Sequence, residues 1–124
     1  MGSQREKQME PVDISQAVGR WADQWASTHV QFAFIPPPGA TKVRIIATKS
    51  EHTPDVLLLV NAGAQTVRRQ VVAAGLFWVD VPFAITDGEC IVTIQSSPTF
   101  IPKELGINDD VREVSYILHG AEAH

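Results

Sequence analysis

Short runs in which apolar and polar residues alternate are the feature of this 124-residue chain that most restricts its fold. Residues 42–48 and 89–96 show the alternation most clearly. A period of two places successive side chains on opposite faces of a β-strand, so each run has one face for a core and one for water. The runs are separated by proline, glycine and asparagine, which end strands and form turns.

The sequence predicts about eight such strands with little helix between them. They include residues 30–35, 42–48, 56–60, 65–72, 76–82, 89–96 and 112–118. This pattern is typical of an all-β protein, and we expect an antiparallel β-sandwich with a jelly-roll-like arrangement. We predict one domain over residues 12–119, preceded by a disordered arm at residues 1–11 and followed by a short tail at residues 120–124.

The segment before the first of these strands allows two interpretations. Ile14, Val18, Trp21 and Trp25 share one face of a helix, which predicts a short N-terminal helix, although Gly19 weakens it. The alternative is that Trp25 begins the sandwich. In either case we expect the tryptophans to be packing residues rather than ligand platforms.

A long loop that carries apolar side chains precedes the last strand. Pro98 and Pro102 keep this segment out of a central ladder, because proline has no backbone N–H. We expect Phe100, Ile101 and Leu105 to anchor the loop, because large apolar side chains are more stable packed on a core than exposed to water.

The end of this loop is rich in turn-forming residues. Gly106 permits a sharp turn, and Asn108, Asp109 and Asp110 can hydrogen-bond their own backbone. We expect Asp110 to fix the turn and to pair with Arg112. The alternative is that Arg112 spreads its fork of N–H donors over loop carbonyls.

The loop and the strand after it resemble the end of a β-sandwich domain found appended to bacterial glycosyltransferases and related surface-polysaccharide enzymes. The family pattern reads approximately s-tF-P-elG-s-D-R-Lsf-l, and a weaker likeness extends over about residues 25–119. The matching residues are Thr99, Phe100, Pro102, Glu104, Leu105, Gly106, Asp110, Arg112, Val114, Ser115, Tyr116 and Leu118. Val114 stands where the family often has leucine. The resemblance implies a structural motif made by Phe100, Pro102, Gly106, Asp110 and Arg112, and a setting in surface-polysaccharide synthesis.

Composition argues against several classes of partner. The formal net charge is −4, and the only basic pair is Arg68-Arg69, so we predict no nucleic-acid or anionic-membrane surface. No apolar run approaches the length of about 20 residues that spans a bilayer as a helix. The single cysteine and the lack of a leader-like N-terminus predict a cytoplasmic protein.

The sequence also lacks the local patterns of catalysis and metal binding. It has no G-x-S-x-G motif, and Cys90 alternates with core residues, which predicts an inert buried thiol. Glu104, Asp109 and Asp110 do not have the spacing of an EF-hand or form an evident carboxylate pair. The histidines show no metal-ligand spacing; they are His29, His52, His119 and His124. We therefore predict a protein that is not an enzyme, with no cofactor and no metal.

Residues 76–82 indicate the most informative surface. Phe77 and the two valines after it make the better core face, so Trp78 and Asp80 face outward. An exposed indole beside polar groups suits the C–H faces and hydroxyls of a sugar. The first hypothesis is therefore a carbohydrate-binding-like accessory domain, with Trp78, Asp80, Arg44 and Arg68 as candidate binding residues.

The second hypothesis is a structural or docking module without sugar binding. Trp78, Ile46, Ile35 and Leu76 would then form an exposed apolar surface that binds a second copy or a glycosyltransferase domain. A dimer that Trp78→Ala converts to a monomer would distinguish this hypothesis from the first.

Overall fold

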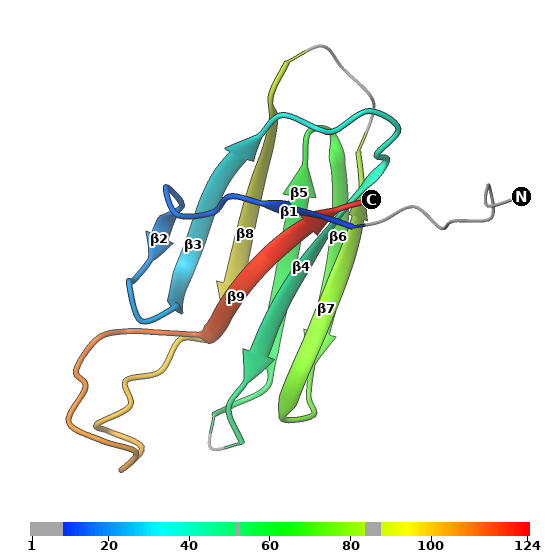
Figure 1. Cartoon of the computed structure of the whole chain (residues 1–124). Helices are drawn as coiled ribbons and strands as arrows, with labels where there is room; N and C mark the ends of the chain where they lie inside the picture. The colour runs from blue at the N-terminus through cyan, green and yellow to red at the C-terminus, as the bar shows by residue number, and fades with distance from the viewer. Residues whose placement is uncertain (1–8, 52, 84–87) are drawn as a thin grey trace, which may run out of the picture.

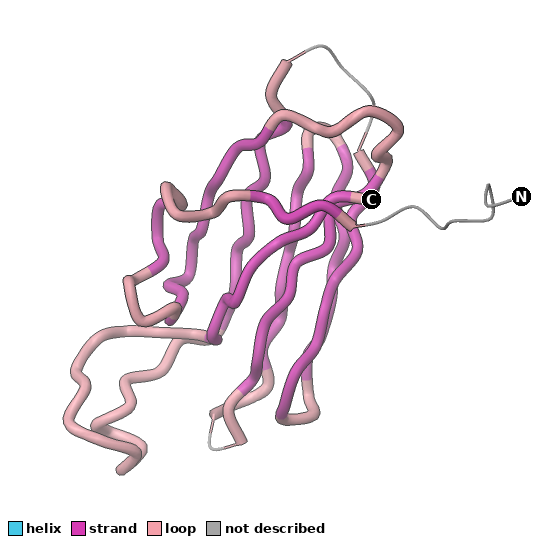
Figure 2. Tube along the Cα trace, in the orientation of Figure 1, coloured by secondary structure: helices cyan, strands magenta, loops and turns pink. Residues whose placement is uncertain are grey.

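The computed structural model describes residues 9–51, 53–83 and 88–124, and in these residues the chain is all-β (Figures 1 and 2). The described residues form no helix, and therefore no helix that is long and apolar enough to cross a membrane. The described residues form nine strands: β1 (Glu10–Val12), β2 (Val18–Arg20), β3 (Trp25–Phe34), β4 (Lys42–Lys49), β5 (Val56–Ala62), β6 (Gln65–Val71), β7 (Gly75–Pro82), β8 (Cys90–Ser97) and β9 (Tyr116–Ala123).

All the strands belong to one antiparallel sheet that curls back on itself (Figure 1). The order is β6-β5-β8-β3-β9-β4-β7, with β1 paired to β9 and β2 paired to β3. Strands β3 and β9 join the two halves of this order through only two residue pairs, Trp25↔Ile117 and Ala26↔Tyr116. The end strands β6 and β7 of this order also contact each other, so the body is nearly closed and barrel-like.

The alternating side chains fill the interior as the sequence predicts. In β4, Val43, Ile45 and Ala47 are buried while the residues between them are more exposed. The same holds in β8, where Cys90 is a buried free thiol. Six strands contribute fully buried side chains to one core, among them Val30, Ile45, Leu58, Val79, Val92 and Leu118.

The prediction of a short N-terminal helix is wrong. Gly19 has a φ of +88°, and a Cβ at this position would overlap the backbone carbonyl of His29. The chain therefore passes directly against β3 here, which only glycine permits. The segment forms β2 instead of a helix, and β3 begins at Trp25, as the alternative interpretation expects.

The strands extend beyond the predicted domain limits at both ends. Of the arm expected at residues 1–11, residues 1–8 lie outside the described residues, but Glu10–Val12 form β1 and pair with β9. The tail expected at residues 120–124 is largely the second half of β9, between β1 and β4. Ala121 and Ala123 are buried there, and two small residues gave too weak an alternation to predict a strand.

The loop before β9 is anchored mainly by one residue. Phe100 is buried, forms a β-bridge with Val114 and packs edge-on against Trp25, with 5.6 Å between the ring centroids. Ile101 is partly buried, whereas Leu105 is 45% exposed, so the prediction that Leu105 anchors the loop is wrong. The Phe100–Val114 bridge closes the loop at its base. Leu105 lies further out along the loop, beyond this bridge.

Candidate functional site

The outward side of β7 presents Trp78 and Asp80. Their neighbours Phe77, Val79 and Val81 point into the core, so the alternation along the strand turns the other residues to the surface. Trp78 is 49% exposed, which is unusual for a side chain with so much apolar area.

Trp78, Ile46 and Gly120 lie side by side across three strands, and we call these residues the Trp78 row. Ile46 of β4 is opposite Trp78 of β7 on one side and opposite Gly120 of β9 on the other. Two strand spacings separate the ends of the row, a distance of about 10 Å. A Cβ at Gly120 would meet no atom within 4 Å, so the surface there is open.

An ion pair lies along one side of the Trp78 row. Arg44 donates from Nε to Oδ1 of Asp80 at 2.8 Å and from Nη2 to Oδ2 at 3.0 Å. The same guanidinium lies 5.2 Å from the centroid of the Trp78 ring. Glu122 is opposite Arg44 on β9. Arg44 is thus fixed by a bidentate contact and by ring stacking, which orders the side chains around the indole.

The charges next to Asp80 keep it ionised. The hydrogen bonds from Arg44 are the main reason that the pKa of Asp80 is lowered, and they outweigh the opposing effect of partial burial. His124 adds a smaller contribution from Nε2, which lies 3.5 Å from Oδ1 of Asp80. At neutral pH this side of the row therefore offers a carboxylate that only accepts hydrogen bonds.

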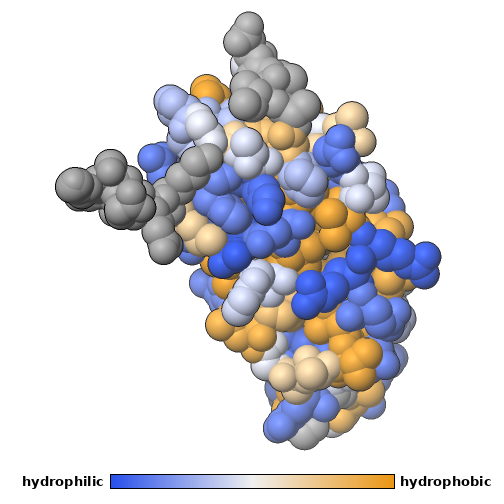
Figure 3. All heavy atoms as spheres, turned by 90° about the vertical axis from the view of Figure 1, so that its right-hand side faces the viewer, coloured by the Kyte–Doolittle hydropathy of each residue, from blue (hydrophilic) through white to orange (hydrophobic). Residues whose placement is uncertain are grey.

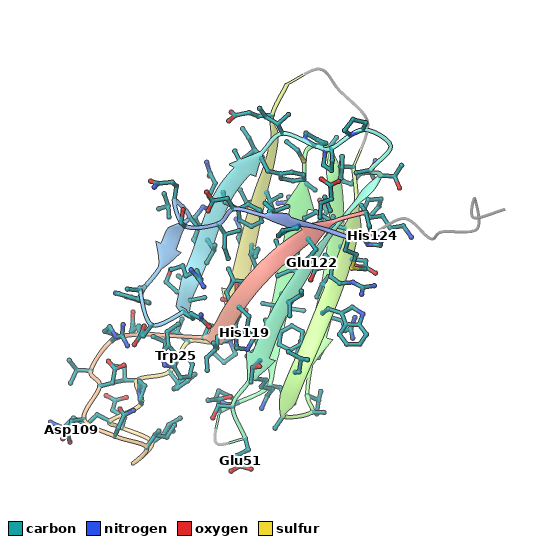
Figure 4. All side chains as sticks on the ribbon, in the orientation of Figure 1. Trp25, Glu51, Asp109, His119, Glu122 and His124 are labelled. Carbon is teal, nitrogen blue, oxygen red and sulfur yellow. The ribbon has the colours of Figure 1, made fainter. Side chains whose placement is uncertain are left out.

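Hydrogen-bonded polar groups lie along the other side of the row. Thr48 Oγ1 is 2.7 Å from His119 Nε2, and His119 Nδ1 is 3.1 Å from Gln24 Oε1. His119 reaches this position because the register between β4 and β9 shifts after Ile46, so that two successive residues, His119 and Gly120, face away from the core. Figure 4 shows His119, Glu122 and His124 in succession along β9.

A shallow hollow of about 360 Å³ continues the Trp78 row over β9. Ile46, His119, Gly120 and Glu122 line it on the β9 side, and Pro11, Val12 and Ile14 close it on the β1 side. The surface thus combines an indole, an apolar floor and fixed donors and acceptors on both flanks. Such a surface can bind a small ligand that has both C–H faces and hydroxyl groups.

The structure does not bring Arg68 into this site. Arg68 is exposed on β6, opposite Leu59 of β5, and β5 belongs to the other half of the strand order. Within the described residues, no hydrogen bond, ion pair or ring contact joins Arg68 to Trp78, Asp80 or Arg44. Of the four candidate binding residues, three therefore lie together and Arg68 does not.

Arg112 is the centre of a second polar cluster, at the base of the loop before β9. Its Nη2 lies 2.7 Å from Asp110 Oδ2 and 2.6 Å from Asp23 Oδ2, and its guanidinium lies 4.9 Å from the Trp21 ring centroid. These hydrogen bonds lower the pKa values of both carboxyls and raise that of Arg112. The cluster ties the loop to the turn before β3, which is a structural role.

The other residues of the loop motif also shape the backbone. Pro102 is buried, and its carbonyl accepts a hydrogen bond of 3.0 Å from the backbone N–H of Ile107. Gly106 has a φ of +73°, the left-handed region that glycine adopts easily. Asp110 accepts a hydrogen bond of 2.9 Å from the backbone N–H of Arg112. In this motif, Phe100 and Pro102 are buried, Gly106 forms the turn, and Asp110 holds Arg112 by hydrogen bonds.

Sequence inspection missed the residues that β9 and the turn before β3 contribute. Gly120 and Glu122 fall in the segment interpreted as a tail, and His119 faces outward only because of the bulge. Asp23 and Trp21 fall in the segment interpreted as a helix. The alternating alanines of β9 were the one local signal for a strand there.

Within the part of the chain that the structure describes, no group of three or more His, Cys, Asp or Glu side chains could hold a metal ion. Comparisons with family models, curated proteins and solved structures find no match to this chain. The function is therefore inferred from the geometry of its side chains.

Proposed function

We propose that this protein is a non-catalytic carbohydrate-binding domain and that the Trp78 row, with Arg44 and Asp80, binds the sugar. The observation that carries the proposal is a half-exposed indole, held in place by Arg44, with fixed polar groups on both flanks. An indole packs against the C–H face of a pyranose ring, while carboxylate, guanidinium and imidazole groups bond its hydroxyls.

We also propose that the fold is a jelly-roll sandwich. The strand order supports this, because it divides into a group of four strands, β1-β9-β4-β7, and a group of five, β2-β3-β8-β5-β6, joined by only two residue pairs. Consecutive strands of the chain alternate between the groups, as in a jelly roll, except at the β2–β3 and β5–β6 pairs. Lectin domains are among the proteins built on this architecture, so the fold is compatible with sugar binding.

The loop motif supports a proposal about the setting of the domain. Residues 98–118 resemble the end of domains appended to glycosyltransferases, so we propose that this domain serves as an accessory to an enzyme of surface-polysaccharide synthesis. Cys90 is a free thiol whose pKa is raised by burial, and a chain with one unpaired cysteine suits a reducing compartment. We therefore keep the cytoplasm as the proposed location.

A docking or dimerisation surface is the second candidate function. Leu76 is 63% exposed on the same side of β7 as Trp78, which favours an apolar contact. However, Ile35, the fourth residue of the expected apolar surface, is at the end of β3 and lines a different hollow. On the β7 side shown in Figure 3, hydrophobic residues are separated by hydrophilic ones. This arrangement favours a ligand with mixed polarity.

The test is a glycan-array screen followed by titration of a hit through tryptophan fluorescence. We expect Trp78→Ala and Arg44→Ala to weaken binding at least about tenfold, which corresponds to about 1.4 kcal/mol. Arg68→Ala is the matched control, because it removes an exposed arginine outside the site, and it should leave binding unchanged. Circular dichroism would verify that each variant is folded.

One result would contradict the proposal and support the second candidate. In that result, the wild-type protein binds no glycan at millimolar concentration and is a dimer by light scattering, and the Trp78→Ala variant is a monomer.

A further inference from the structure

A groove of about 760 Å³ runs beside the end of β3, and Trp78, Arg44 and Asp80 do not line it. Phe32 and Phe34 point into the core, whereas Ala33 and Ile35 are exposed, yet all four line this groove. Successive side chains of a strand point to opposite faces. A space that touches all four must therefore lie alongside the edge of the strand, next to its backbone.

This edge of β3 has no paired strand among the described residues. β2 pairs with β3 only as far as Val18↔Gln31, and β8 covers the opposite edge as far as Phe34↔Cys90. Val18 lines the groove, so the groove reaches the β2 side of β3, and Glu89 and Ile91 extend it across the outward face of the strand toward β8. Alternate residues of 32–35 thus present backbone donors and acceptors to the groove, and such an edge readily pairs with another strand.

The groove is both apolar and acidic. Val18, Ile35 and Ile91 contribute large apolar side chains that are 67%, 75% and 49% exposed. Its charged lining residues are all acidic: Glu10, Asp13 and Glu89, with no Lys, Arg or His among the described residues around it. A partner of complementary chemistry is an extended segment that carries both basic and apolar side chains.

The charge also argues against a second copy as the occupant. Two copies that paired through the same edge would bring the carboxylates of both grooves together, and like charges in apposition disfavour binding. The strand on the far side of the groove, β1, carries Pro11, which lacks an N–H and so protects its own edge. The edge of β3 has no proline before Pro36, so it is the edge open to pairing.

We propose that this groove binds an extended peptide segment of a partner protein, with alternating basic and apolar residues, which pairs with residues 32–35 as an added strand. Backbone hydrogen bonds give affinity in this mode, and the side-chain pockets give specificity. The contact would attach the domain to its partner and leave the Trp78 row uncovered.

The probe is a synthetic peptide of alternating lysine and valine, titrated into the ¹⁵N-labelled 124-residue chain. Within residues 32–35, we expect the amides that point away from β8 to exchange with solvent at least about tenfold more slowly in the complex. The same peptide with alternate N-methylated amides should bind at least about tenfold more weakly, because it cannot complete the ladder. A glutamate–valine peptide should not bind.

Charge-reversal variants locate the contact. Glu10→Lys combined with Glu89→Lys should lower the affinity for the lysine–valine peptide at least about tenfold, and by more at low salt. The control, Glu104→Lys combined with Asp109→Lys, makes the same change in net charge at exposed positions of the loop before β9 and should have little effect. Ile35→Ser should also weaken binding, because it removes an apolar contact without disturbing the core.

Three results would overturn the proposal. One is no saturable binding of the lysine–valine peptide at millimolar concentration. Another is binding without protection of the β3 edge or without sensitivity to N-methylation. The third is a wild-type dimer, detected by light scattering, that Ile35→Ser dissociates, since the occupant would then be a second copy. None of these measurements uses a glycan, so their outcome is separate from that of the sugar proposal.

Discussion

Gly120→Val tests whether the open surface at the end of the Trp78 row is what binds a ligand. Gly120 lies inside β9, its φ is outside the left-handed region, and an added Cβ meets no atom within 4 Å. Glycine in a strand costs about 0.5–1 kcal/mol relative to a residue with a side chain. The variant should therefore keep or gain about that much stability, which raises the melting temperature by about 2–4 °C in a domain of this size.

Valine at this position would nevertheless obstruct the hollow beside Ile46. The hollow measures about 360 Å³ and is shallow, so a branched side chain on its floor displaces any ligand that lies across β9. We expect the affinity for a sugar to fall at least about tenfold, or about 1.4 kcal/mol. Gly120→Ala, which adds a single methyl group, should have a smaller effect.

Two measurements on the same samples decide the outcome. Thermal unfolding followed by circular dichroism reports the stability, and tryptophan fluorescence reports the affinity for the glycan. Ala33→Val is the matched control, because it adds the same kind of side chain to an exposed strand position of β3. Unchanged affinity in a folded Gly120→Val variant would refute the assignment of the row. A loss of more than about 1 kcal/mol in stability would refute the inference that the surface is open.

Two further substitutions test the energetics of the fold. Tyr116 is fully buried and its hydroxyl has no hydrogen-bond partner among the described residues, so Tyr116→Phe should raise the free energy of unfolding in urea by about 1 kcal/mol, whereas a loss of that size would reveal a partner. The pKa of Asp80 is lowered in the folded protein, so its carboxylate stabilises the fold above the unfolded pKa of about 4 and this contribution is lost as pH falls through the folded value. Asp80→Asn should therefore cost about 1 kcal/mol at pH 7, since the pair with Arg44 is partly exposed, and the difference from wild type should shrink as the pH is lowered past that window; a difference independent of pH would contradict this.

The strands and their buried faces could be predicted because alternation is a local property. Phe77, Val79 and Val81 are two residues apart, and no knowledge of the partner strand is needed to place them inside. The same argument places Trp78 outside. The prediction of a helix in the N-terminal segment is wrong because helical spacing can arise by chance. The close approach of Gly19 to β3 depends on His29, a residue ten positions away.

The composition of the site could be predicted only in part, because it depends on pairing between distant strands. Arg44 and Asp80 are 36 residues apart, and they meet because β4 pairs with β7. Arg68 is nearer to Asp80 in sequence, but the chain enters the other half of the sheet at β5 and β6. The bulge that turns His119 outward is a property of the β4–β9 register, which no local pattern encodes.

The two proposed surfaces share one structural element, which is β1. Pro11 and Val12 line both the hollow over Gly120 and the groove beside β3. β1 is held to β9 by only three residue pairs, so it is the short strand through which occupancy of one surface can affect the other. Coupling between binding sites is reciprocal. If the lysine–valine peptide changes the affinity of the protein for a glycan, the glycan must therefore change the affinity for the peptide by the same factor. Equal affinities in the presence and absence of the other ligand would show that β1 holds its position on β9 and that the two surfaces act independently.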